Sequence, residues 1–482
     1  MSDWLRQQLV AVANEFPERL AVDGGKAGQL TYSALFGLAS ALVRDVSEHA
    51  SIGILSNRRP ETYVAVLACF LGGIPFTPLN PKFPEERLKK IIELSAVNLV
   101  LHDRTTADQA SALGCPARAI DLSGEHLEAD TAEFAEDAIV YRMFTSGSTG
   151  EPKGVPIPSR ALSHYIRFIG ETLQLPAEGR YSQLFDLSFD LSIHDIFVTF
   201  ANGGTLVPAS EINLLMPHAY IAKQAIDVWF SVPMLAMSAS RGLAGAVPTH
   251  RLKLALFCGE ALPMDYVRGF RALMEEGTPL WNLYGPTEAT IAFTAKLVDP
   301  DDDSDGSANL GDPFGDNEIA ILDDAGSVQP VTEGARGELL LAGPQVFSGY
   351  QPPRHDPFVE GRYYKSGDIV TFRDGELKYE GRKDNQVKVR GMRIELAEIE
   401  SAFRNHLGCD SAAAIVFGQL EEAELRVAYT APHDISDLGA LEKHLPNYMV
   451  PARIWRLEEL PVNANGKVDR KKLGEIEWPS QD

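Results

Sequence analysis

The sequence predicts an α/β fold with largely parallel sheets, because strand-like and helix-like segments alternate along the chain. Short apolar runs typical of buried strands cover residues 97–101, 138–144 and 252–257. Segments with helical periodicity cover residues 84–94, 159–173 and 265–276. A strand followed by a helix brings the chain back to a parallel neighbouring strand, so this alternation favours parallel pairing.

The pattern changes after about residue 310. Short strands with glycine-rich turns are expected at 337–342, 363–367 and 375–381, which predicts a smaller β-rich unit. A strand at 386–389, a helix at 395–405, two more strands and a basic tail follow. This last piece of about 100 residues has the size of an independent α+β domain. We therefore expect an N-terminal domain over 1–381, a C-terminal domain over 385–482 and a hinge near 382–384.

Composition narrows the class of protein. At about 150 residues per domain, 482 residues correspond to about three domain-sized units. The net charge of −23 argues against nucleic acid and membrane surfaces as partners, since both attract basic surfaces. The four cysteines lie far apart, and the N-terminus carries no signal-peptide pattern, so a cytoplasmic protein is expected.

The strongest local signal is the segment 144–154, where a predicted strand is followed by hydroxyl residues, glycines and one lysine. The residues concerned are Thr145, Ser146, Gly147, Ser148, Thr149, Gly150 and Lys153. Glycines let backbone N–H groups approach phosphate oxygens, hydroxyls add donors, and lysine adds a positive charge. A Walker A loop cannot be fitted here, because Gly150 is followed by Glu-Pro and Lys153 by glycine, which argues against kinase and GTPase chemistry.

Four further motifs occur in order: Asn-Leu-Tyr-Gly-Pro-Thr-Glu at 282–288, Tyr-Lys-Ser-Gly-Asp at 364–368, the segment 381–391, and Asn-Gly-Lys-Val-Asp-Arg at 465–470. With the phosphate-loop segment, they make the chain resemble the superfamily of adenylate-forming enzymes over essentially its whole length. The resemblance implies two α/β subdomains plus the β-rich subdomain in the N-terminal domain. It also implies a mobile C-terminal domain that swings about Asp384.

The residue types suit the chemistry that this resemblance implies. Loop hydroxyls and Lys153 can hold phosphates, Glu288 can coordinate Mg²⁺ through oxygen, and Asp368 can accept from ribose hydroxyls. The positions matched to the ATP or AMP site are Thr145, Ser146, Gly147, Ser148, Thr149, Gly150, Lys153, Gly259, Glu260, Ala261, Asn282, Tyr284, Gly285, Thr287, Asp368 and Arg382. Lys467, Thr145 and Glu288 match catalytic positions. The implied cofactors are ATP and Mg²⁺.

The activated acid is indicated by a duplicated Phe-Asp-Leu-Ser at 185–192. Amino-acid-activating members carry this motif directly before a helix, which selects Asp190 over Asp186. A buried carboxylate requires a cationic partner, and the α-ammonium of an amino acid supplies one. The alternative is that Asp190 caps the following helix.

The resemblance also implies a substrate pocket with mostly apolar walls. Its residues are Asp190, Leu191, His194, Phe230, Leu256, Cys258, Leu283, Ile291 and Ala292. Such a lining predicts a small, mostly aliphatic side chain, as in alanine or proline. Two interpretations of His194 stay open: it binds a polar side chain such as that of serine or threonine, or it is a core histidine satisfied by a neighbour.

The predicted protein is a freestanding amino acid adenylation enzyme of the nonribosomal peptide type. It resembles D-alanine–carrier protein ligases and prolyl-carrier-protein ligases. The acceptor is expected to be the phosphopantetheine thiol of a separate carrier protein. Two other functions are weighed against this one: an acyl-CoA synthetase for a small carboxylic acid, and a catalytically silent ATP- or AMP-binding protein. The second is disfavoured because Lys467, Glu288 and Asp368 are all present.

Overall fold

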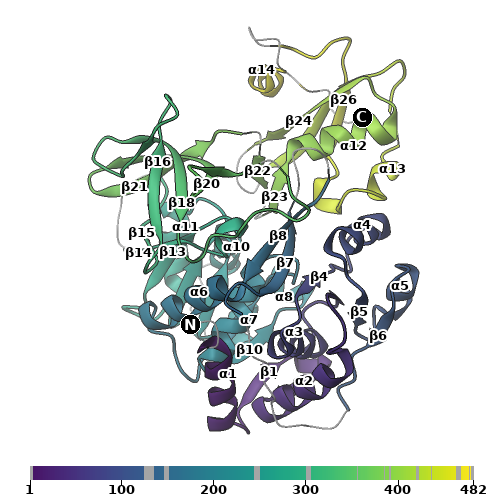
Figure 1. Cartoon of the computed structure of the whole chain (residues 1–482). Helices are drawn as coiled ribbons and strands as arrows, with labels where there is room; N and C mark the ends of the chain where they lie inside the picture. The colour runs from purple at the N-terminus through teal and green to yellow at the C-terminus, as the bar shows by residue number, and fades with distance from the viewer. Residues whose placement is uncertain are drawn as a thin grey trace. The chain divides into compact units, whose positions relative to one another are not determined.

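The computed structural model is traced in chain order in Figure 1. It describes residues 4–123, 135–145, 151–243, 250–299, 306–354, 356–384, 386–389, 392–418, 423–435, 437–462, 468–476 and 478. The chain divides into two compact units. Unit 1 comprises Met1–Pro81, Ile92–Met143 and Gly154–Lys383, and unit 2 comprises Lys82–Ile91, Phe144–Lys153 and Asp384–Asp482.

One sheet of the described chain has the strand order β6-β5-β3-β4-β7-β8. The strands are β3 (Ile52–Leu55), β4 (Phe76–Pro78), β5 (Leu99–His102), β6 (Ala117–Ala119), β7 (Ile139–Thr145) and β8 (Lys153–Pro158). The pairs from β6 to β7 are parallel. The accompanying helices are α2 (Tyr32–Val46), α3 (Pro60–Gly72), α4 (Glu85–Ser95) and α5 (Ala107–Ala112). Beyond its first turn, helix α3 is apolar on all sides, and it is therefore almost wholly buried.

A larger sheet has the order β15-β14-β13-β12-β11-β9-β10-β1-β2. The strands are β1 (Leu20–Asp23), β2 (Gln29–Thr31), β9 (Arg180–Gln183), β10 (Thr205–Pro208), β11 (Val228–Ser231), β12 (Leu254–Phe257), β13 (Leu280–Tyr284), β14 (Thr294–Val298) and β15 (Asp312–Pro313). The pairs from β1 to β13 are parallel, and the edge strands β2, β14 and β15 are antiparallel. The predicted α/β fold class with largely parallel sheets is confirmed.

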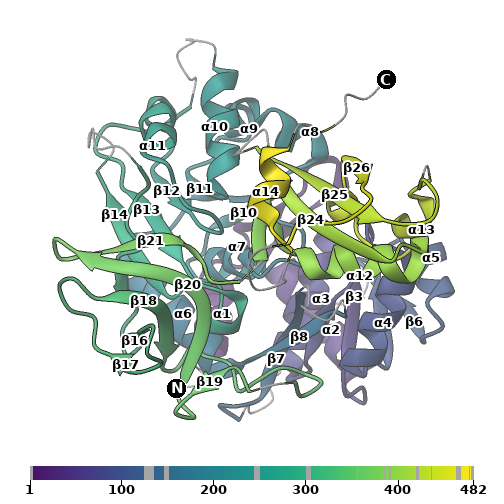
Figure 2. The ribbon, with the colours of Figure 1, turned by 90° about the horizontal axis from the view of Figure 1, so that it is seen from above.

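Helices cover both faces of this larger sheet. They are α1 (Trp4–Glu15), α6 (Ser159–Thr172), α7 (Leu191–Ala201), α8 (Glu211–Leu215), α9 (Pro217–Gln224), α10 (Pro233–Gly242) and α11 (Met264–Phe270). Figure 2 shows α10 and α11 on one side of the strands and α6 and α7 on the other. Side chains alternate accordingly: Phe230 and Leu256 join the core on the α7 side, whereas Trp229 and Phe257 join the core on the α10 side.

The third sheet of unit 1 is antiparallel throughout and forms the β-rich part. Its strands are β16 (Glu318–Leu322), β17 (Val328–Gln329), β18 (Arg336–Ala342), β19 (Phe358–Val359), β20 (Tyr363–Arg373) and β21 (Glu376–Arg382). The strand predicted over 363–367 extends to Arg373, because it pairs with β18 on one edge and β21 on the other.

The C-terminal segment of unit 2 has mixed α and β structure. Its elements are β22 (Gln386–Val389), β23 (Met392–Glu395), α12 (Leu396–Leu407), β24 (Ser411–Phe417), β25 (Glu424–Thr430), α13 (Gly439–Glu442), β26 (Arg453–Arg456) and α14 (Arg470–Glu475). Strands β24 and β25 are antiparallel, and β26 lies parallel to β25. The expectation of two strands after the helix was incomplete, since β26 adds a third, and β23 was also not predicted.

One predicted helix ends earlier than expected. The helical pattern over 265–276 predicts a continuous helix, but α11 stops at Phe270 and a 3₁₀ turn covers Arg271–Leu273. The chain then becomes extended so that Met274 can pair with Leu252. Tertiary pairing therefore overrides the local periodicity. No helix in the described part of the chain combines the length and apolar character needed to span a membrane.

Candidate active site

Three residues predicted to bind the nucleotide form one hydrogen-bonded cluster in unit 1. Asp368 on β20 lies opposite Arg382 on β21, and the guanidinium donates to Oδ1 of Asp368 over 2.8 Å. The hydroxyl of Tyr284, at the end of β13, donates to Oδ2 over 2.5 Å. Burial and the neighbouring Asp368 raise the pKa of Tyr284 well above its usual value, so this hydroxyl remains a donor. Each carboxylate oxygen can accept a second hydrogen bond, so the fixed carboxylate keeps acceptor capacity for two ligand hydroxyls.

Glu288 lies in a buried 3₁₀ turn, Thr287–Ala289, shortly after Tyr284. Its side chain is 0 % exposed, and Oε1 accepts a hydrogen bond from the Tyr350 hydroxyl over 2.8 Å. No group of three or more histidine, cysteine, aspartate or glutamate side chains suited to a metal occurs in the described residues. An ion held by Glu288 would therefore need further oxygen ligands from a bound molecule, as Mg²⁺ commonly takes from phosphates.

The backbone after Glu288 makes a strained turn. Thr290 and Ile291 have φ angles of 61° and 70°, which β-branched residues rarely adopt. Gly285 permits the close approach of this turn, because a Cβ there would lie 2.7 Å from Cα of Ala292. Strained backbone of this kind is held only where the surroundings determine it, and such sites are often functional.

The fully buried side chain of Gln345 holds this turn in place. Its Nε2 donates to the carbonyl of Ala292 over 2.7 Å and lies 3.3 Å from the carbonyls of Ala289 and Thr290. Oε1 of Gln345 in turn accepts from Nδ2 of Asn317 over 2.8 Å. One amide thus fixes the turn that carries the predicted pocket residues Ile291 and Ala292.

Asp190 immediately precedes α7. Its backbone is helical, with φ −62° and ψ −22°, and within the described residues its carboxylate makes no capping hydrogen bond to the helix. The helix-cap alternative is therefore not supported, since a capping aspartate normally has an extended backbone and a bonded side chain. The charge of Asp190 contributes, after burial, to the raised pKa values of Tyr141 and Tyr165. The carboxylate therefore lies near two buried hydroxyls.

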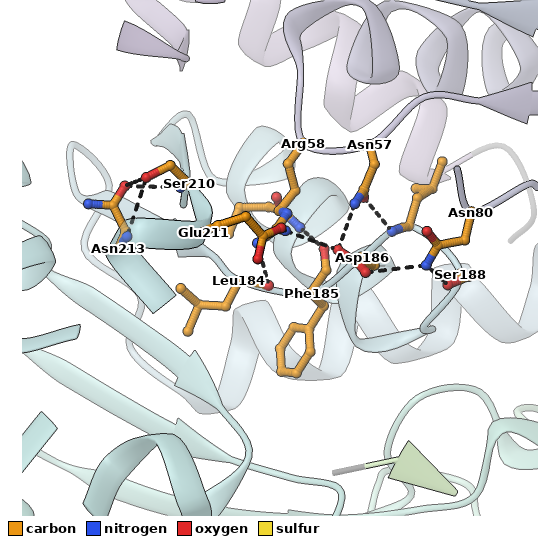
Figure 3. Close-up of polar contacts among 12 residues, drawn as sticks. Asn57, Arg58, Asn80, Leu184, Phe185, Asp186, Ser188, Ser210, Glu211 and Asn213 are labelled. Carbon is orange, nitrogen blue, oxygen red and sulfur yellow. Dashed lines mark hydrogen bonds and ion pairs between the residues drawn. The ribbon is translucent and has the colours of Figure 1, made fainter. Parts of the chain in front are cut away.

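Asp186, four residues earlier, occupies a different environment (Figure 3). Oδ1 accepts from Nδ2 of Asn57 over 2.6 Å and pairs with the guanidinium of Arg58 over 3.2 Å. Oδ2 accepts from Nδ2 of Asn80 over 3.2 Å. The Arg58 side chain is only 7 % exposed and also pairs with Glu211 at 2.6 Å. Both oxygens of Asp186 are thus bound within the protein, and this aspartate anchors the loop that leads to Asp190.

His194 lies one turn into α7 and is 2 % exposed. Its Nδ1 is 2.6 Å from the hydroxyl of Tyr165 on α6, and its ring lies 4.1 Å from the ring of Phe230. Burial lowers the pKa of His194 to about 3, so the imidazole is neutral at physiological pH. The histidine is thus satisfied on one side by a neighbour.

The remaining predicted pocket residues are buried in the same core. Phe230, Leu256 and Leu283 come from the neighbouring strands β11, β12 and β13, and Cys258 follows β12. The set of buried side chains is completed by Leu191, Ile291 and Ala292. These positions lie toward the carboxyl ends of parallel strands, where open α/β sheets commonly bind ligands.

Comparison with known proteins decides the family. The family model described as AMP-binding enzyme matches residues 9–351. The chain belongs to the AMP-binding enzyme family. This confirms the predicted adenylate-forming superfamily and the prediction of an enzyme.

Several relatives of this AMP-binding enzyme are peptide synthetases or ligases. Phosphinothricin tripeptide synthetase PhsC of Streptomyces viridochromogenes is 33% identical over 96% of this chain and 44% of its own length. L-proline–[L-prolyl-carrier protein] ligase of Streptomyces coelicolor is 36% identical over 69% of this chain and 65% of its own length. The chain thus spans less than half of PhsC and about two thirds of the ligase.

A solved structure is similar to nearly the whole chain. The Vibrio cholerae adenylation domain AlmE, in complex with glycyl-adenosine-5'-phosphate, matches with a TM-score of 0.88 and 28% identity. The match covers 98% of this chain and 97% of AlmE. The fold is therefore that of an adenylation domain.

Several predicted site residues lie outside the described residues. They are Ser146, Gly147, Ser148, Thr149, Gly150 and Lys467. Thr145 is the last residue of β7, with Oγ1 buried and without a partner among the described residues, and Lys153 is the first residue of β8. Gly259, Glu260 and Ala261 follow β12, Asn282 lies on β13, and Gly285 and Thr287 follow it. Oδ1 of Asp384 accepts from the backbone N–H of Gln386 over 3.2 Å, and the hinge role of Asp384 stays a prediction.

The sequence pattern did not identify Tyr165, Gln345 or the Asn57–Arg58–Asn80 group. Tyr165 lies on an amphipathic helix whose apolar side faces the core, so its hydroxyl gives no separate signal. The one local sign for Gln345 was its place in a Gly-Pro-Gln segment directly after a strand, which is common in loops.

Proposed function

We propose that this AMP-binding enzyme activates a small amino acid with ATP and transfers it to the phosphopantetheine thiol of a separate carrier protein. In the first step the amino acid carboxylate attacks the α-phosphate of ATP, forming aminoacyl-AMP and releasing pyrophosphate. In the second step the thiol attacks the acyl carbon and AMP leaves. The similarity to a prolyl-carrier-protein ligase and to peptide synthetases supports both steps.

The nucleotide roles follow from the residue chemistry. Asp368, held by Arg382 and Tyr284, accepts from the ribose hydroxyls. The hydroxyls of Thr145, Ser146, Ser148 and Thr149, with Lys153, would hold the phosphates. Glu288 would hold Mg²⁺, which would neutralise phosphate charge. Lys467 bridges the substrate carboxylate and the α-phosphate. Asp384 serves as the hinge between the two steps.

The observation that carries the amino acid assignment is the contrast between two aspartates in one repeated motif. Asp186 is bound by Asn57, Arg58 and Asn80, whereas Asp190 caps no helix within the described residues and lies near the buried hydroxyls of Tyr141 and Tyr165. A carboxylate at the edge of an apolar core favours a cationic ligand, and an α-ammonium group provides that charge.

The size of the side chain is inferred from the lining. Phe230, Leu256, Leu283 and Ile291 are bulky and buried, and a pocket lined by such residues favours a small side chain. The solved complex of AlmE with glycyl-adenosine-5'-phosphate is consistent with a small amino acid in a related site.

Amino-acid-dependent exchange of pyrophosphate into ATP tests the proposal. The panel contains both enantiomers of the common amino acids and simple carboxylic acids lacking an amine. We expect a strong response to one or a few small amino acids. A response confined to acids without an amine would instead show that the enzyme activates simple carboxylic acids. An assay offering CoA or a carrier protein as acceptor would then decide whether it is an acyl-CoA synthetase.

The catalytic lysine is tested by Lys467→Ala, with Lys472→Ala in the nearby basic helix α14 as the matched control. Lys467→Ala should abolish adenylate formation while ATP binding is retained, because the lysine acts on the reacting groups and not on the adenosine. Lys472→Ala should form adenylate at the normal rate. Adenylate formation at the normal rate by the 467 variant would refute this role.

A further inference from the structure

The predicted pocket residue His194 contacts a second buried polar side chain, Tyr165, on the neighbouring helix. Tyr165 of α6 and His194 of α7 are almost fully buried, and the tyrosine Oη lies 2.6 Å from Nδ1 of the imidazole. The contact joins residues 29 positions apart in the sequence. Among the described residues neither side chain has another hydrogen-bond partner. Their remaining hydrogen-bonding capacity is therefore available to a ligand.

The direction of this hydrogen bond follows from what each group can do. A tyrosine hydroxyl carries one proton and, within the described residues, Nδ1 of His194 is its sole acceptor. Leaving a buried O–H without an acceptor costs about 1–3 kcal/mol. The hydroxyl therefore donates, and Nδ1 accepts. A neutral imidazole that accepts at Nδ1 carries its proton at Nε2.

The charge state of the ring agrees with this assignment. Burial lowers the pKa of His194 to about 3, so the ring is neutral across the physiological range. Burial, followed by Cys258 and Asp190, raises the pKa of Tyr165 far above its usual value, so the hydroxyl keeps its proton. Both protons are therefore fixed: one lies between Tyr165 and Nδ1, and the other is on Nε2.

We propose that Nε2–H of His194, oriented by Tyr165, donates a hydrogen bond to a hydroxyl on the side chain of the activated amino acid. This inference rests on the proposed function, because it uses the same pocket. It assigns the substrate class as small hydroxyl amino acids, of which serine and threonine are the common examples. Tyr165 acts as a positioning residue, since it acts through His194.

The surroundings favour a neutral, short acceptor. The imidazole ring packs 4.1 Å from Phe230, and Leu256, Cys258 and Leu283 belong to the same buried cluster. A neutral N–H donor amid apolar side chains does not compensate a charged carboxylate, whose burial requires a cation. An aliphatic substrate side chain would leave Nε2–H of His194 buried without an acceptor. Sites built to hydrogen-bond a substrate hydroxyl reject analogues without that hydroxyl for this reason.

The wild-type protein allows a direct test with isosteric pairs. Pyrophosphate exchange is measured with threonine against valine and with serine against 2-aminobutyrate, so that each pair exchanges a hydroxyl for a methyl group. We expect kcat/KM to be about 10- to 100-fold higher for the hydroxyl member, as the loss of one hydrogen bond with a buried donor implies. Equal values, or a preference for valine or alanine, would overturn the inference and leave the proposed function intact. No response to any amino acid would refute the proposed function itself.

Two variants distinguish an effect of Tyr165 on the orientation of His194 from a general effect of losing a buried tyrosine hydroxyl. Tyr165→Phe removes the hydroxyl that fixes Nδ1 as an acceptor, so the hydroxyl preference within each pair should fall at least several-fold. The control Tyr220→Phe removes another buried tyrosine hydroxyl, which donates to the carbonyl of Val207 in the other core, on the α10 side of the sheet. The hydroxyl preference of Tyr220→Phe within each substrate pair should match that of the wild-type protein. An unchanged preference in Tyr165→Phe would overturn the role of Tyr165.

Nitrogen-15 NMR of the histidine-labelled protein gives a readout independent of activity. The expected spectrum contains a buried neutral histidine protonated at Nε2, and this signal should change in Tyr165→Phe and persist in Tyr220→Phe. A buried neutral histidine protonated at Nδ1 that is affected by Tyr165→Phe would contradict the assigned hydrogen-bond direction. The spectrum of the wild-type protein alone already tests the protonation of His194 at Nε2, so this measurement does not depend on the stability of Tyr165→Phe.

Discussion

Two aspartates in identical short sequences have different environments. Phe-Asp-Leu-Ser occurs twice between residues 185 and 192, yet Asp186 is bound by three side chains and Asp190 opens a helix without capping it among the described residues. The difference arises from position relative to α7 and from the neighbours that other segments supply. The two aspartates therefore provide a matched pair for experiment.

Asp190→Asn should lower kcat/KM for the amino acid by about 10²-fold or more, because losing one partner of a buried charge pair costs about 2–5 kcal/mol. ATP binding and thermal stability should change little. Asp186→Asn should instead lower the free energy of unfolding by about 1–3 kcal/mol, since it removes one of the two carboxylates paired with the buried Arg58 guanidinium and weakens the bonds from Asn57 and Asn80. Amino acid titrations and thermal melts of both variants give the comparison. The reverse pattern would mean that Asp186 is the residue that binds the substrate.

One side chain, that of Gln345, holds the geometry of a whole turn. The 3₁₀ turn Thr287–Ala289 and the left-handed residues Thr290 and Ile291 depend on the Gln345 amide, which contacts three backbone carbonyls. The turn connects the predicted metal ligand Glu288 with the pocket wall. Loss of the amide should therefore affect both stability and substrate binding.

Gln345→Met keeps the approximate length of the side chain and removes the amide. We expect a loss of about 2–4 kcal/mol in the free energy of unfolding, because several buried carbonyls lose their donor. We also expect a rise in KM for the amino acid that exceeds the rise in KM for ATP. Gln8→Met is the control, since Gln8 donates to the single carbonyl of Ala201 and is partly exposed. If both variants behave alike, the turn does not depend on Gln345.

The elements differ in how far the sequence could predict them. The strands at 97–101, 138–144 and 252–257 and the helix at 159–173 were located within a few residues, because each has a clear apolar pattern. The end of α11 was missed because Met274 pairs with Leu252, and β26 was missed because its burial is only partial. The motifs predicted Asp368, Arg382 and Tyr284 as nucleotide-site residues, but the hydrogen bonds among them come from the structure. The Tyr165–His194 pair and the Gln345 contacts were not predicted, since they join segments 29 and more than 50 positions apart.

Net charge affects the protein at the scale of the whole molecule. A charge of −23 produces a long-range repulsion toward other acidic proteins. Carrier proteins are often acidic, so productive encounter would require a local basic or apolar docking surface on this chain. Salt weakens the long-range repulsion between the two net charges more than it weakens contacts at a local docking surface, because screening shortens the range of the electric field.

We therefore predict that kcat/KM for an acidic carrier protein rises several-fold between about 0.01 M and about 0.15 M salt, over which the Debye length falls from about 30 Å to about 8 Å. The repulsion between the two net charges is screened over that range, while a contact at close range is screened less. Free pantetheine, an uncharged thiol, serves as the control acceptor, and its rate should vary little with salt. Pyrophosphate exchange measured in parallel shows whether salt affects adenylation. A carrier rate that instead falls with salt would show that attraction to a basic docking surface outweighs the net charge of the chain.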